Sequence, residues 1–80
     1  MDGIRQRETE PDPGLVVLSV NGERRETGSS TLEEMVRELG YGDARIATAV
    51  NGEFVAAGAR AACRLQAGDR VEIVAPRQGG

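Results

Sequence analysis

The clearest structural signal in the chain lies at residues 30–40, Ser30-Thr31-Leu32-Glu33-Glu34-Met35-Val36-Arg37-Glu38-Leu39-Gly40. Its apolar residues recur at i, i+3, i+4 and i+7, the spacing of one stripe along a helix, and they are Leu32, Met35, Val36 and Leu39. Ser30 and Glu33 have the spacing of a capping box, in which each side chain accepts a hydrogen bond from a backbone amide at the helix start. Gly40 supplies the left-handed residue that closes a helix. The stretch therefore predicts one helix with a single face to bury.

Short strands are predicted on both sides of this helix. Residues 15–20 and 46–50 are largely aliphatic, and each run ends in Asn-Gly, at 21–22 and at 51–52. Asn-Gly suits both positive-φ positions of a two-residue hairpin turn, so the chain should return along residues 23–27 and 53–55. A last strand is expected at residues 71–74, before Pro76, because proline cannot donate to a β-ladder. Residues 56–64 should form a loop or a single helical turn.

The order strand, strand, helix, strand, strand, strand predicts an α+β fold. One helix stripe is buried by packing on one face of a mixed five-stranded sheet. A hairpin that holds a single crossover helix is the β-grasp, or ubiquitin-like, arrangement. We expect a disordered N-terminal extension at residues 1–14, a β-grasp domain at 15–75 and a flexible C-terminal tail at 76–80.

Composition excludes most enzyme chemistry within this chain. The 80 residues include one Cys and no His, which excludes a Cys/His zinc site, a Ser-His-Asp triad, a His general base and an intrachain disulfide. We expect no catalytic side chain and no metal. A net charge of −3 argues against nucleic acid, and no apolar run approaches the ~20 residues that span a bilayer. A lone Cys and the lack of a signal peptide favour the cytoplasm.

The chemistry is expected at Gly79 and Gly80, the last two residues. A chain with 11 glycines ends in Gly-Gly by chance in roughly 2% of cases, and here the pair follows a predicted strand and a short unstructured segment. Residues 76–80 can extend to ~17 Å, enough to thread into another protein's active site. Residues without Cβ atoms let backbone approach backbone there. The predicted reactive group is the α-carboxylate of Gly80.

A carboxylate is a poor electrophile, so a partner must activate it. Attack on the α-phosphate of ATP would give an acyl-adenylate with release of pyrophosphate. Sulfur from a persulfide would then displace AMP and leave a thiocarboxylate, whereas a thiol followed by a lysine would give an isopeptide. Neither route needs a catalytic residue in this chain, because the partner supplies positioning and charge stabilisation. We expect no bound cofactor, with ATP used by the partner.

Four segments and the terminal Gly-Gly together resemble one known family. The segments are VNGE at 20–23, STLEEMVREL at 30–39, AVNGEFV at 49–55 and LQAGDRVEIV at 65–74. They are similar to those of ThiS, the sulfur carrier protein of thiamine biosynthesis. The resemblance implies that Gly80 is adenylated by a ThiF-like enzyme and converted to a thiocarboxylate, with sulfur from a cysteine desulfurase or another persulfide donor. It also implies delivery to thiazole synthase (ThiG) and recognition of Gly79 and Gly80 by these partners.

Two departures from the family pattern leave alternatives open. Ala56 and Ala57 stand where such proteins usually carry a proline, and the extension at 1–14 is unusual. One alternative is a MoaD-like small subunit of molybdopterin synthase, although the double proline and apolar residue that often precede its Gly-Gly are missing. Others are a ubiquitin-like modifier joined to lysines and a β-grasp interaction module with an inert tail.

Several remaining side chains have two interpretations. Cys63 is expected to be a packing residue rather than a persulfide site, since nothing nearby in the sequence would lower its pKa. Phe54 and Val74 belong either to an apolar docking patch on the open sheet face or to the core. Arg77 either pairs with a partner or is solvated. The acidic helix face is expected to be simply exposed to solvent, and it comprises Glu33, Glu34 and Glu38.

Overall fold

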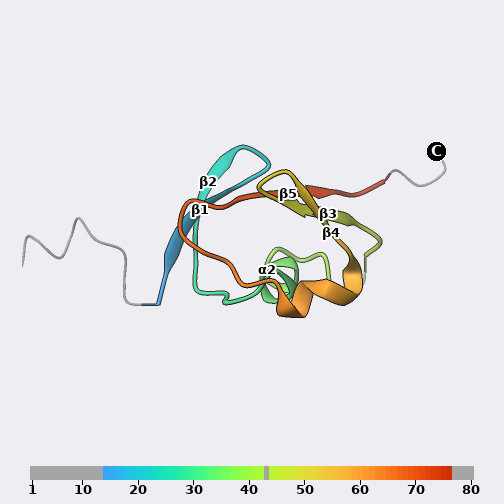
Figure 1. Cartoon of the computed structure of the whole chain (residues 1–80), viewed down its shortest axis with the longest axis horizontal. Helices are drawn as coiled ribbons and strands as arrows, with labels where there is room; N and C mark the ends of the chain where they lie inside the picture. The colour runs from blue at the N-terminus through green and yellow to red at the C-terminus, as the bar shows by residue number, and fades with distance from the viewer. Residues whose placement is uncertain (1–13, 43, 77–80) are drawn as a thin grey trace, which may run out of the picture.

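The computed structural model of the chain describes residues 14–42 and 44–76 (Figure 1). Its elements, in chain order, are β1 (Val16–Val20), β2 (Glu23–Thr27), α2 (Leu32–Glu38), β3 (Ala47–Val50), β4 (Glu53–Val55), the 3₁₀ helix η1 (Ala57–Ala62) and β5 (Arg70–Val74). The predicted extension except Gly14, and the predicted tail beyond Pro76, lie outside the described residues. Every predicted strand and the predicted helix are present, and the 56–64 segment contains a short 3₁₀ helix.

The five strands form one mixed sheet in the order β2-β1-β5-β3-β4. β5, the last strand within the described residues, lies in the centre, parallel to β1 and antiparallel to β3. Each outer pair is an antiparallel hairpin, β1–β2 on one side and β3–β4 on the other. Figure 1 shows α2 and η1 on the same side of this sheet. The predicted α+β fold with one main helix is confirmed.

The core lies between α2 and the sheet face that it covers. The helix stripe is buried as predicted: Leu32 and Met35 are fully inaccessible, Val36 is buried and Leu39 is half-buried at the rim. The sheet and the segment before β5 contribute the other buried apolar side chains, which are Leu18, Leu65, Val71 and Ile73. In β5 buried and exposed residues alternate, so one face of the sheet packs on the helix and the other faces outward.

The N-terminal cap of α2 lies one residue later than the sequence suggested. The capping residue is Thr31, whose hydroxyl accepts from the Glu34 amide at 3.2 Å, while the Glu34 carboxylate accepts from the Ser30 amide at 2.7 Å. The predicted Ser30 and Glu33 pair is therefore wrong. Thr31 is held extended by a β-bridge to Arg64, and the Leu65 amide donates to the Ser30 carbonyl at 2.9 Å. This pairing with a distant segment delays the start of the helix.

The C-terminal end of α2 is closed as predicted by Gly40, whose φ is +91°. The Gly40 amide donates to the Arg37 carbonyl and the Tyr41 amide to the Val36 carbonyl, each at 3.0 Å. These two bonds form a Schellman motif, which satisfies carbonyl groups at the helix end.

Candidate functional site

The described part of the predicted site is the carboxyl-terminal end of β5. Val74 pairs with Ala47 of β3, and the chain continues through the exposed Ala75 and Pro76 toward the predicted tail. Figure 1 shows this end of β5, in red, leaving the sheet at the side away from the β1–β2 hairpin. Gly79, Gly80 and Arg77 lie outside the described residues, so their roles remain predictions.

Two asparagine side chains fasten β5 to the hairpins beside it. The Asn51 side chain accepts from the Arg70 amide at 2.9 Å, at the start of the strand, and donates to the Asp69 carboxylate at 3.1 Å. The Asn21 side chain accepts from the Ile73 amide at 2.8 Å and donates to the Ile73 carbonyl at 3.2 Å, near the strand's end. Sequence reasoning assigned these asparagines to turns alone. The tetrapeptide Val-Asn-Gly-Glu occurs twice, and this repeat is the sequence signal that could have pointed to both asparagines.

The outward face of the sheet carries an exposed apolar patch beside the end of β5. Phe54 is 72% exposed and Val74 is 60% exposed, so the core-packing interpretation of both residues is wrong. The register pairs Phe54 with Ala49 and Val74 with Ala47, which places these four residues on the face opposite α2. We call Ala47, Ala49, Phe54 and Val74 the outer apolar patch. Exposed apolar side chains that cluster beside a functional segment are typical of interaction surfaces.

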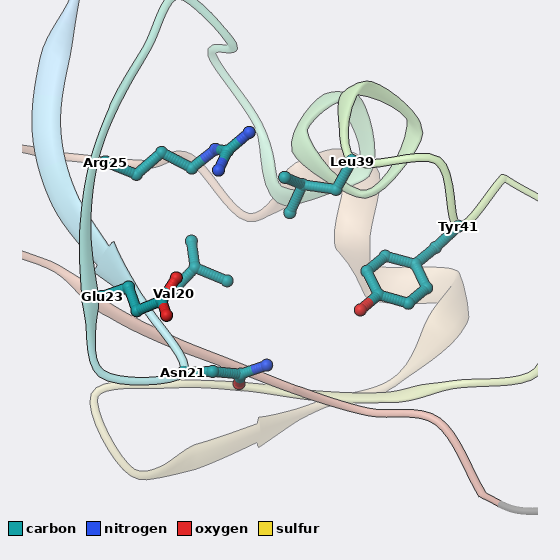
Figure 2. Close-up of a pocket in the computed structure, with 6 residues that line it drawn as sticks. All are labelled: Val20, Asn21, Glu23, Arg25, Leu39 and Tyr41. Atoms are coloured by element: carbon teal, nitrogen blue, oxygen red, sulfur yellow. The ribbon is translucent and has the colours of Figure 1, made fainter.

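A hollow with a volume of about 290 Å³ lies between the β1–β2 hairpin and the end of α2 (Figure 2). Its lining comprises Val20, Asn21, Glu23, Arg25, Leu39 and Tyr41. Figure 2 shows the Arg25 guanidinium and the Tyr41 hydroxyl pointing inward from opposite sides. Arg25 and Glu23 carry opposite charges and both are exposed, so the hollow has no net charge with which to select an ion.

Glu38 does more than face solvent, although it is exposed as predicted. One of its carboxylate oxygens accepts from the hydroxyl groups of Thr27, at 2.7 Å, and Ser29, at 2.8 Å. These two hydrogen bonds, with a smaller contribution from the charge of Arg25, lower the pKa of Glu38, because they favour the charged form. The carboxylate thereby ties the end of β2 to the last turn of α2.

Cys63 packs against the core, and its packing role is confirmed. Partial burial, and secondarily the Asp69 carboxylate, raise the pKa of its thiol, so the reactive thiolate is disfavoured. Within residues 14–42 and 44–76, no group of three or more His, Cys, Asp or Glu side chains is placed to hold a metal ion. No helix in the described part of the chain is long and apolar enough to cross a membrane.

A central C-terminal strand between two hairpins, packed on one helix, defines the class of small β-grasp proteins. Within that class the chain belongs to the ThiS family, whose family model matches residues 17–80. Its fold is similar to the crystal structure of the thiamine biosynthesis protein ThiS from Geobacter metallireducens, with a TM-score of 0.66 and 29% sequence identity. That match covers 81% of this chain and 100% of the other. No curated protein matches the chain in sequence.

Proposed function

We propose that this chain is a sulfur carrier for thiamine biosynthesis and that its reactive group is the α-carboxylate of Gly80. The observation that carries the proposal is the match to the ThiS family, which runs over residues 17–80 and so includes Gly79 and Gly80. The similar Geobacter protein is itself described as a thiamine biosynthesis protein. The chain acts as a protein co-substrate, since its partners do the catalysis.

The proposed chemistry proceeds in steps that the partners catalyse. A Gly80 carboxylate oxygen attacks the α-phosphorus of ATP in a ThiF-like enzyme, pyrophosphate leaves, and an acyl-adenylate forms. The terminal sulfur of a persulfide, generated by a cysteine desulfurase, attacks the acyl carbon and displaces AMP. A thiol then reduces the resulting acyl disulfide, which leaves a terminal thiocarboxylate and a disulfide on the donor. Thiazole synthase (ThiG) consumes the sulfur.

The outer apolar patch gives these partners a surface to hold while the tail enters their active sites. Val74 belongs both to the patch and to the end of β5, the strand that precedes the tail, so a partner that binds Gly79 and Gly80 lies close to it. An exposed Phe and its aliphatic neighbours supply the kind of apolar anchor that dominates interface energetics. Transfer of this kind uses thiols and persulfides, and we place it in the reducing cytoplasm.

Intact-protein mass spectrometry tests the proposal. The chain is mixed with ATP, a ThiF-like adenylating enzyme, a cysteine desulfurase, cysteine and a thiol reductant, beside a variant that lacks Gly80. We expect a mass gain equal to the replacement of one oxygen by sulfur, absent in the variant. Subsequent loss of that sulfur to thiazole synthase, rather than to a molybdopterin synthase large subunit, assigns the pathway. The proposal is overturned if the mass of the chain does not change while the same adenylating enzyme modifies another carrier protein.

A further inference from the structure

We propose that Asn21 is a positioning residue for the C-terminal tail. Its carboxamide holds Ile73, and so fixes the place and direction in which the chain leaves the sheet toward Gly80. This inference rests on the proposed function, because it concerns delivery of the Gly80 carboxylate to the adenylating enzyme.

β1 is too short to support the end of β5. The parallel pairing stops at Val20, opposite Val71, and the backbone amide of Asn21 makes the last main-chain bond, to the Val71 carbonyl at 2.8 Å. The Asn21 side chain then turns onto β5 and bonds both the amide and the carbonyl of Ile73. Figure 2 shows it against the ribbon of β5. One carboxamide thus replaces the next peptide group of β1.

Only asparagine fits both requirements of this position. The backbone of Asn21 has a φ of +52°, in the left-handed region that asparagine and glycine tolerate better than other residues. The contact with Ile73 also needs one donor and one acceptor on the same short side chain, which a carboxamide provides. An aspartate keeps the acceptor and loses the donor, while a glycine loses both.

The contact matters because Ile73 is the last residue of β5 supported on both sides. Beyond it Val74 pairs with β3 alone, and Ala75 and Pro76 are exposed. The residues from 74 to 80 reach at most roughly 25 Å from this support when fully extended. Without the Asn21 carboxamide, the end of β5 becomes an edge that can detach from β3, and the tail leaves the sheet from a variable point.

The second hairpin provides a matched control. Asn51 has the same neighbours in sequence, a φ of +54° and a carboxamide that also bonds the backbone of β5, at Arg70 instead of Ile73. Asn21→Gly and Asn51→Gly keep both turns, since glycine accepts a positive φ, and each removes one carboxamide from β5. The first variant releases the end of the strand at Ile73 and the second releases its start at Arg70, and Asn51→Gly also removes the hydrogen bond to the Asp69 carboxylate.

The experiment combines amide hydrogen exchange by NMR with the kinetics of sulfur loading. In Asn21→Gly we expect exchange at the Ile73 amide to become about tenfold faster, and kcat/KM for thiocarboxylate formation to fall about fivefold, mainly through KM. In Asn51→Gly we expect faster exchange at the Arg70 amide and wild-type kinetics. Asn21→Asp, which retains the acceptor, should show a smaller loss and replaces Asn21→Gly if that variant does not fold.

The outcomes separate this inference from the proposed function. If the Ile73 amide exchanges faster in Asn21→Gly while sulfur loading stays at the wild-type rate, Asn21 has only a structural role and the inference is overturned. An equal loss of kcat/KM in both variants also overturns it, because general weakening of β5 then explains the result. If the wild-type chain itself gains no sulfur, the proposed function fails and the positioning role fails with it.

Discussion

The two hairpins of this protein turn at the same tetrapeptide but have different roles. Val-Asn-Gly-Glu occurs at residues 20–23 and at 50–53, and in both copies Asn and Gly have nearly identical positive φ angles. The first copy leads into the five-residue charged strand β2, and the second into β4, which has three residues and exposes Phe54. The local sequence therefore determines the conformation of each turn. The role of each hairpin depends instead on the strand that follows the turn and on which end of β5 the turn contacts.

The largest difference between the hairpins should lie in their share of the core. Leu18 of β1 is buried and packs with α2 residues, so Leu18→Ala removes transfer free energy and leaves a cavity. We expect the free energy of unfolding to fall by ~2–5 kcal/mol, measured by urea denaturation. Val55→Ala in β4, a partly buried residue that packs against the core from the second hairpin, is the control, and it should cost less. Equal losses would show that the first hairpin is no more central to the core than the second.

Phe54 of the second hairpin should behave in the opposite way. Phe54→Ala removes an exposed ring, so we expect the free energy of unfolding to change by less than ~0.5 kcal/mol. Affinity for the adenylating enzyme, measured by calorimetry, should fall about tenfold, because an apolar anchor is lost. Arg24→Ala on the charged strand β2 is the matched exposed control. Unchanged affinity in Phe54→Ala would contradict the role of the outer apolar patch.

The turn glycines should be equivalent in the two hairpins. Gly22 and Gly52 have φ angles of +88° and +86°, and a Cβ at either position would meet nothing within 4 Å. Substitution by alanine therefore costs only the backbone strain, and we expect Gly22→Ala and Gly52→Ala each to lower the free energy of unfolding by ~1–2 kcal/mol. A thermal melt of each variant measures this. A clear difference between the two losses of stability would show that the two turns do not contribute equally to the free energy of unfolding.

The smallest expected effect concerns the tie between the first hairpin and α2. The pKa of Glu38 is lowered in the folded state by the Thr27 and Ser29 hydroxyl groups, so the charged carboxylate stabilises the fold above its unfolded pKa. This stabilisation is lost as pH falls through the folded pKa. In Glu38→Gln we expect a weaker decline of stability with acid than in the wild type, with Glu33→Gln as the control. Parallel pH profiles in all three proteins would contradict this expectation.

Local signals were enough to predict the elements of this fold. The helix stripe, the closing Gly40 and both Asn-Gly turns depend on residues a few positions apart, and all are confirmed. The start of α2 was misplaced because Thr31 pairs with Arg64, which lies far away in the sequence. The resemblance of four segments also led correctly to the ThiS family.

The remaining features required the folded chain. The contact between Asn21 and Ile73 joins residues 52 positions apart, and no periodicity reveals it. Likewise, the Arg60 guanidinium donates to the Thr48 hydroxyl at 3.0 Å and the Ile46 carbonyl at 2.8 Å, which fixes η1 beside β3. The exposure of Phe54 was undecided in the sequence because a strand as short as β4 shows no clear alternation.

The central position of β5 has a consequence for how the protein is made. The two hairpins do not pair with each other, since β5 lies between them. Among the strands that the structure describes, β5 is synthesised last. Isolated two-stranded hairpins are only marginally stable in water. A nascent chain that ends before residue 70 lacks the strand that joins its two hairpins into one sheet. Folding therefore waits until translation has passed β5. We expect a chain cut short before β5 to leave its apolar core residues exposed and therefore to be open to proteolysis.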